Sequence, residues 1–178
     1  MKSKLHGIIY PFMIAMLFGC FPLVEEPLRG DFQTEGYKPV YVSAEEIEKI
    51  QIQGPKAMEN PGKIYIRGQY LFVNDRFEGI HIVDNGNPSQ PNKIAFIQIP
   101  GNVDMAVKGN YLYADNGTDL IVLDISQPQA VKIGKRIDNA FPQQKFPPFR
   151  GYFECVDDSR GTVIAWERAT LNSPQCFR

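Results

Sequence analysis

Beyond Pro61, apolar and polar residues alternate in short runs, and turn residues separate one run from the next. The runs are rich in β-branched and aromatic residues: Ile64-Tyr65-Ile66, Tyr70-Leu71-Phe72-Val73, Ile80-His81-Ile82-Val83-Asp84 and Ile94-Ala95-Phe96-Ile97-Gln98-Ile99. Successive side chains of a strand point to opposite faces of a sheet, so this pattern is typical of half-buried β-strands. Arg67-Gly68-Gln69 is expected to form the turn between the first two strands.

The same order of runs returns further along the chain. Lys108-Gly109-Asn110-Tyr111-Leu112-Tyr113 repeats the segment that begins at Arg67, 41 residues later, and 120–124 repeats 80–84 after 40 residues. A weaker third copy begins at Gly151 and continues through Trp166. A period of about 40 to 45 residues with four strands per unit is typical of propeller blades, which stack because one sheet cannot cover its own apolar faces. We therefore expect an all-β fold of propeller-like antiparallel repeats over residues 61–178, with two clear units and a partial third.

Two of these runs carry a family motif. Ile80-His81-Ile82-Val83-Asp84 and Leu120-Ile121-Val122-Leu123-Asp124 resemble the LVIVD repeat, and Ile125-Ser126-Gln127-Pro128 resembles the I-S-x-P that usually follows it. The resemblance covers about residues 62–138. Members of that family are bacterial, often exported or lipidated, and propeller-like, so the resemblance implies the fold and export. It implies no particular biochemical activity, because one fold supports many functions.

The number of repeats is small for a propeller. Closed propellers have about four to eight blades, so three arrangements are open: several chains assemble, the module is open and capped, or the chain is a shortened relative of a longer protein. The proline-rich segment from Phe141 to Phe149 is expected to lie over an exposed sheet edge and blunt it.

Residues 1–19 have the pattern of a signal peptide. Lys2 and Lys4 are followed by an uncharged, largely apolar run from Gly7 to Phe18, which is shorter than the roughly 20 residues of a membrane-spanning helix. Leu17-Phe18-Gly19-Cys20 resembles the lipobox of bacterial lipoproteins. An ordinary secretory signal would instead end in an Ala-x-Ala-like site, which is missing here. The resemblance implies that Cys20 becomes the N-terminus and carries fatty-acyl chains such as palmitate, which anchor a protein stably when two or more are present.

Residues 20–60 are expected to form a tether and a short helix. The stretch from Phe21 to Pro39 has several Pro and Gly and no apolar period, whereas Ser43-Ala44-Glu45-Glu46 fits a capping box. Ile47 and Ile50 would then share one face of a helix that ends before Gly54. The acidic pair Glu25-Glu26 resembles a surface-export signal but is equally well explained as a solvated charge pair. We therefore expect the protein at the outer membrane, on either its periplasmic face or its outer face.

Charge and cysteine content indicate which partners are expected and whether a disulfide forms. The formal net charge is −1 and there is no basic stripe, so nucleic acid is not an expected partner. Three cysteines leave Cys155 and Cys176 once Cys20 is lipidated, and in an exported protein they are expected to pair. Such a bridge would stabilise the fold by about 3 kcal/mol. Two free thiols are the alternative.

Few side chains suggest catalysis. Asp84 and Asp124 end equivalent strands, where an Asp accepts hydrogen bonds from backbone N–H groups two residues on, and Gly68 and Gly109 are expected to adopt a positive φ in hairpin turns. His81 has no nucleophile or zinc-ligand motif in its neighbourhood and should lie on the opposite strand face from Ile80 and Ile82. No catalytic residue, metal site or cofactor is predicted.

Two groups of residues admit a second interpretation. The carboxylates at strand ends are expected to be solvated turn residues, but on one rim they would offer a Ca²⁺ site; they are Asp75, Asp115, Asp157 and Asp158. Tyr152, Phe153 and Trp166 are expected in the core, with an aromatic binding platform as the alternative.

The leading hypothesis is a lipid-anchored, non-enzymatic module that contacts the membrane through its lipid and binds a protein partner or itself. The rival hypothesis is a propeller-type enzyme in which rim carboxylates hold a metal or a small ligand.

Overall fold

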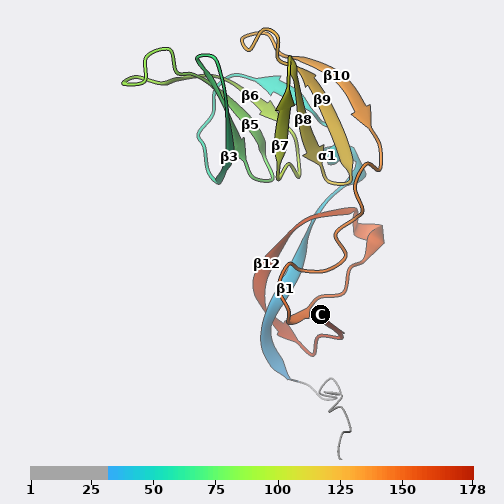
Figure 1. Ribbon diagram of the computed structural model, residues 1–178. Coiled ribbons are helices and arrows are strands. Elements are labelled where there is room, and N and C mark those ends of the chain that lie inside the picture. The colour runs from blue at the N-terminus through green and yellow to red at the C-terminus, as the bar shows by residue number, and fades with distance from the viewer. Residues whose placement is uncertain (1–31) are drawn as a thin grey trace, which may run out of the picture.

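The computed structural model describes residues 32–178, which form three β-sheets (Figure 1). Two sheets correspond to the two clear repeats and stack side by side, and the third lies at one end of this pair. The all-β expectation is confirmed. In the described residues, no helix is long and apolar enough to cross a membrane.

Each repeat is an antiparallel meander. The first contains β3 (Pro61–Arg67), β4 (Tyr70–Asp75), β5 (Gly79–Asp84) and β6 (Asn92–Gln98), and the short strand β2 (Gln51–Gln53) pairs with β6 at its edge. The second contains β7 (Met105–Lys108), β8 (Tyr111–Asn116), β9 (Asp119–Asp124) and β10 (Lys132–Ile137). Gly68 and Gly109 open the two equivalent turns with φ of +57° and +59°, a conformation that glycine adopts without strain.

Strand alternation gives each repeat two distinct faces. We call the face that carries Phe72, Ile80 and Ile82 the front of the first repeat. The equivalent front of the second repeat, 40 or 41 residues on, carries Tyr113, Leu120 and Val122, and the opposite faces are the backs.

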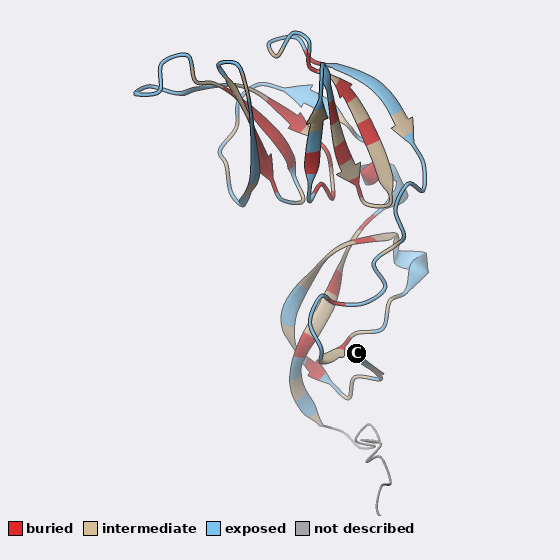
Figure 2. Ribbon diagram, in the orientation of Figure 1, coloured by how far each residue is buried: buried red, intermediate tan, exposed pale blue. Residues whose placement is uncertain are grey.

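The first front face packs on the second back face. The shared core contains fully buried residues from both repeats: Phe72, Ile80, Ile82, Ile97, Ile99, Leu112, Ala114, Ile121, Leu123 and Ile125. Figure 2 shows this buried layer between the two sheets. The contact is head-to-tail, as between neighbouring propeller blades, and it leaves one back face and one front face without a partner repeat.

The third sheet has a different topology from the repeats. It combines β1 (Gln33–Val42) from before the repeats with β11 (Tyr152–Phe153), β12 (Thr162–Asn172) and β13 (Cys176–Phe177) from after them, in the order β12-β1-β11-β13. β1 is antiparallel to β12 and parallel to β11. The C-terminal segment therefore forms a sheet with the N-terminal strand and does not continue the row of repeats as a sequential third blade.

The predicted tether is wrong where it overlaps β1. Residues 33–39, expected to be irregular, are strand because they pair with β12, whose residues lie more than a hundred positions away. Gly36 allows β11 to approach on the other side, since a Cβ there would lie 2.5 Å from the Tyr152 carbonyl oxygen. No local apolar period is needed for a strand whose partners are supplied from elsewhere in the chain.

The predicted helix is present but short. α1 (Ala44–Ile47) begins with the expected capping box, in which Ser43 Oγ accepts from Glu46 N and the Glu46 carboxylate accepts from Ser43 N. Ile50 lies beyond its end, and the next residues form β2, so the prediction of one helix to Gly54 was wrong in length. The β6 edge offers backbone partners that the local pattern could not indicate.

Candidate functional site

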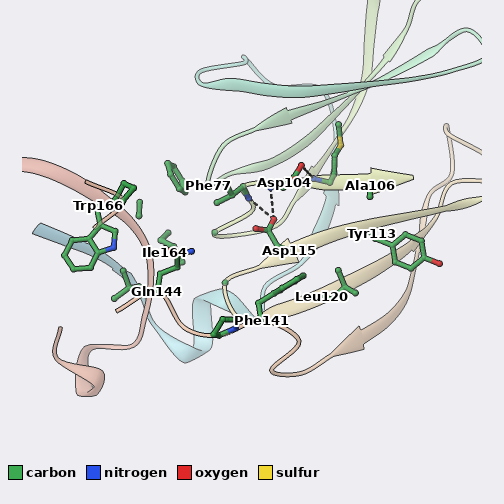
Figure 3. A pocket seen from close by; sticks show the side chains of 18 residues that line it. Phe77, Asp104, Ala106, Tyr113, Asp115, Leu120, Phe141, Gln144, Ile164 and Trp166 are labelled. Carbon is green, nitrogen blue, oxygen red and sulfur yellow. Dashed lines mark hydrogen bonds between the residues drawn. The ribbon is translucent and has the colours of Figure 1, made fainter. Parts of the chain in front are cut away.

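A cavity of about 590 Å³ lies where the second repeat meets the third sheet (Figure 3). Its wall comes from the front face of the second repeat, the loop between β6 and β7, the β4–β5 turn of the first repeat, the proline-rich segment after β10, and β12. The lining is mostly apolar and aromatic, including Phe77, Leu120, Phe141, Ile164 and Trp166. Pockets of this size and character are typical of small-molecule sites.

The cavity occupies the position that a third blade would fill. In the first repeat, Phe72 and Ile80 are buried against the second repeat. Their equivalents on the second front face, Tyr113 and Leu120, line the cavity instead and are only partly buried. A surface built to be covered by the next blade is therefore left available to a ligand.

The proline-rich segment forms one wall of this cavity. Phe141 N donates to the Thr118 carbonyl, at the turn between β8 and β9, and Pro142 and Pro148 also line the space. The segment was expected to cover an exposed sheet edge. It instead contacts the turn between β8 and β9, the two inner strands of the sheet, because β12 brings the third sheet to that end of the repeat.

Asp115 is one of the few polar residues of the cavity wall, together with Asp104, Gln144 and Tyr113. Its Oδ1 accepts three hydrogen bonds, from Asn102 Nδ2 at 2.7 Å, Val103 N at 2.8 Å and Asp104 N at 2.9 Å. Oδ2 accepts none from the residues that the structure describes. Burial raises the pKa of Asp115 above its ordinary value and outweighs these hydrogen bonds, and the nearby Asp104 charge adds to the rise.

A chain of buried amides connects this carboxylate to the first repeat. Asn74, which occupies in the first repeat the place of Asp115 in the second, donates from Nδ2 to Asn102 Oδ1 at 2.6 Å. Asn102 is fully buried, and its Nδ2 donates hydrogen bonds to the Asp115 carboxylate and to the Asp104 carbonyl. In the first repeat, Nδ2 of this polar front-face residue thus has a partner in the loop between the repeats, while its buried Oδ1 has none among the described residues; in the second repeat, the equivalent carboxylate faces the cavity.

The charge of the cavity is negative and concentrated at Asp115. The other carboxylate in the wall, Asp104, forms an ion pair with Lys63 at 2.6 Å. The lining contains neither lysine nor arginine. Asp115 therefore has no cationic side chain to balance it within the cavity.

A second titratable pair lies on the opposite side of the stack. His81 and Asp75 are fully buried on or beside the back face of the first repeat, with His81 Nε2 3.0 Å from Asp75 Oδ2. Burial tends to raise the Asp75 pKa, but hydrogen bonds from His81, Asn60 N and Glu59 N outweigh it and lower that pKa overall. His81 lies on the predicted strand face. No hydroxyl or thiol is hydrogen-bonded to its ring within residues 32–178.

The segment between β2 and β3 holds this pair in place. Asn60 N and Glu59 N donate to the two Asp75 oxygens at 2.6 and 3.1 Å, and Lys56 Nζ lies 4.5 Å from the centre of the Phe96 ring. The segment therefore covers the part of the back face around His81 and Phe96, whereas Ile64 and Ile66 on β3 stay exposed. The His–Asp pair helps to hold this segment in place.

The other predicted residues occupy structural positions. Asp84 Oδ1 accepts from Gly86 N at 2.9 Å and Asp124 Oδ1 accepts from Ser126 N at 2.8 Å, both two residues on. Cys155 and Cys176 form a disulfide, with their Cα atoms 5.3 Å apart. Cys20 and the signal peptide lie outside the described residues.

The rim carboxylates are not gathered into one site. Asp75 is buried with His81, Asp115 faces the cavity, and Asp157 caps the short turn η1 (Asp158–Arg160). Asp158 pairs with Lys145. Across residues 32–178, no three His, Cys, Asp or Glu side chains are grouped so that they could hold a metal ion.

The aromatic residues divide between core and cavity. Phe153 is buried and packs edge-to-face on Trp166, with ring centres 5.5 Å apart, while Tyr152 contacts Phe32 and Phe177. Trp166 also lines the cavity, and its buried indole N–H has no hydrogen-bond partner among the described residues. Sequence reasoning missed Asn102 altogether, because an Asn in a loop gives no sign of where its amide points.

The repeats seen in the structure correspond to a known family. The model of the LVIVD repeat matches residues 61–95 and 101–136, which contain the strands β3 to β5 and β7 to β9. The chain matches no curated protein and no solved structure. The motif, the head-to-tail packing of the two units and the family match agree that this part of the chain consists of two LVIVD repeats.

Proposed function

We propose that this protein is a non-enzymatic binding module of the cell envelope, anchored by lipid at Cys20, and that it binds its ligand in the cavity beside Trp166. The observation that carries the proposal is the second front face, which is built like a blade interface but borders a cavity of about 590 Å³. Ligand pockets are commonly 300 to 1,000 Å³ with apolar walls and few polar groups, on the order of what is found here.

The arrangement of the module supports this role. The segment between β2 and β3 covers part of the back face of the first repeat, and the disulfide ties β13 to the residues that follow β11. Disulfides persist in oxidising compartments outside the cytosol, in keeping with an exported protein. The signal-like residues 1–19 and the lipobox-like sequence before Cys20 support the lipid anchor.

The cavity can be tested through Trp166, because it is the single tryptophan of the chain and lines the wall. We would titrate the purified protein with a panel of uncharged, cationic and anionic aromatic compounds of one size and follow indole fluorescence. Binding should shift or quench the emission. The substitution Ala106→Phe fills part of the cavity from an exposed strand position and should weaken every such response.

The matched control is Ala130→Phe, which adds the same side chain at an exposed position outside the cavity wall. Its titrations should equal those of the unaltered protein. A panel that leaves the emission unchanged, or responses that survive Ala106→Phe undiminished, would show that the cavity is not the binding site.

A further inference from the structure

We propose that the cavity selects organic cations, namely an ammonium or guanidinium group on an aromatic or branched aliphatic body, with the cationic group at Asp115 Oδ2. This inference rests on the proposed function, since it names the ligand class for the same cavity. It is carried by the placement of one unbalanced carboxylate in an apolar wall.

The carboxylate is held ready for a cation. Three N–H donors fix Asp115 Oδ1, and one of them comes from Asn102, which is itself held by Asn74 of the first repeat. The rotation of the side chain is therefore restrained, and Oδ2 keeps its capacity to accept. A prepositioned acceptor binds a charged donor with less loss of entropy than a mobile surface carboxylate.

No lysine or arginine lines the wall to compete for this oxygen. Lys63, which pairs with Asp104 of the wall, is held by the Asp104 carboxylate at 2.6 Å and the Met105 carbonyl at 3.2 Å. Partial burial without a counter-charge is costly, and the raised pKa of Asp115 reflects that cost. A cationic ligand would remove it, whereas an anionic ligand would add to it.

The rest of the wall defines the body of the ligand. Trp166, Phe141 and Phe77 contribute aromatic surface, and Leu120 and Ile164 contribute branched aliphatic surface. Figure 3 shows these groups around the space next to Asp115. An apolar body binds more tightly the more of its surface the wall removes from water. This contribution adds to that of the charge at Asp115.

The test compares two probes of nearly equal shape, 2-phenylethylammonium and 2-phenylethanol, on the full chain, with Trp166 emission as the readout. The ammonium compound should bind about tenfold or more tightly than the alcohol, because a charged hydrogen bond in a partly desolvated site exceeds a neutral one. The variant Asp115→Asn keeps an oxygen for the three donors and should bring the two affinities within about twofold.

Asp84→Asn is the matched control, because it removes the same charge from a carboxylate outside the cavity wall. It should leave the preference for the ammonium probe unchanged. Thermal unfolding of each variant verifies that the fold is retained.

The outcomes separate the two proposals. Equal affinities for both probes, or an ammonium preference that persists in Asp115→Asn, would overturn the cation inference while binding in the cavity stands. Failure of both probes together with failure of the whole panel would overturn the cavity itself.

Discussion

Two aspartates of this protein, one fully and one partly buried, show how the surroundings of a carboxyl group set the direction of its pKa shift. Asp75 is fully buried yet has a lowered pKa, because His81 and two backbone N–H groups stabilise its charge. Asp115 is less buried yet has a raised pKa, because its three hydrogen bonds do not offset desolvation and the Asp104 charge. The first carboxylate therefore supports the fold, and the second is available to a ligand.

We predict that Asp75→Asn lowers the free energy of unfolding by about 2 to 4 kcal/mol at neutral pH, because it removes a buried carboxylate that accepts three hydrogen bonds. The folded-state pKa of Asp75 is lowered, so its contribution is present above the unfolded pKa and is lost as pH falls through the folded one. The difference between variant and parent should accordingly shrink in acid. Urea denaturation at pH 7 and pH 3 measures it, and a constant difference would contradict the assignment.

Among the elements, β1 is the strand that the local sequence pattern predicts least well. It joins the N-terminal part of the chain to β12 along its length and contacts β11 at one register position, Tyr37 with Phe153. Gly36 lies at the point of closest approach, where a side chain would meet the Tyr152 carbonyl. The third sheet thus depends on the absence of a side chain at one position.

We predict that Gly36→Val destabilises the protein by about 2 kcal/mol or more, although valine favours strands, because its Cβ would lie 2.5 Å from backbone that cannot move cheaply. Chemical denaturation followed by Trp166 fluorescence measures the loss in the third sheet.

The matched control is Gly54→Ala, since a Cβ at Gly54 meets nothing within 4 Å. That change should stay within about 0.5 kcal/mol of the parent. Equal effects of the two substitutions would mean that the close approach of β11 does not govern the stability of this sheet.

For the whole molecule, the question is how two repeats remain stable without the four to eight blades of a closed propeller, roughly the known range. In this chain, other segments partly cover each end of the stack. The segment through Lys56 and Asn60 covers part of the back of the first repeat, and the proline-rich segment with β12 borders the front of the second. Of the three arrangements considered from the repeat count, the capped module accounts best for these contacts.

We therefore predict that the protein lacking residues 1–20 is a compact, β-rich monomer at micromolar concentration. Light scattering gives its mass and circular dichroism its fold. A discrete oligomer that dissociates when the exposed Ile64 and Ile66 are changed to Thr would instead mean that the back face of one copy completes the stack of another.

The lipid anchor is tested separately from the fold. Cells that express the chain should incorporate labelled palmitate into it, and Cys20→Ala should abolish the label and release the protein from the membrane fraction. Cys155→Ala serves as the control, because its thiol belongs to the disulfide and lipidation should persist. Equal labelling of the Cys20→Ala variant would exclude Cys20 as the acylated residue.

The sequence alone determined the features that local chemistry governs. Alternating apolar residues specify the strands of the two repeats, positive-φ glycines specify their turns, and Asp84 and Asp124 bind the backbone two residues on. The capping box at Ser43 likewise depends on neighbours three residues away. Each of these interactions spans only a few residues, so each leaves a readable pattern.

Only the tertiary structure decided the remaining features, because their partners are distant in the chain. β1 is a strand because it pairs with β12, Asn102 contacts both Asn74 and Asp115, and the cavity forms where both repeats, the proline-rich segment and β12 meet. Asn74 and Asp115 are equivalent in the repeat, but only the packing of the first repeat on the second decides that Asn74 is buried and that Asp115 lines the cavity.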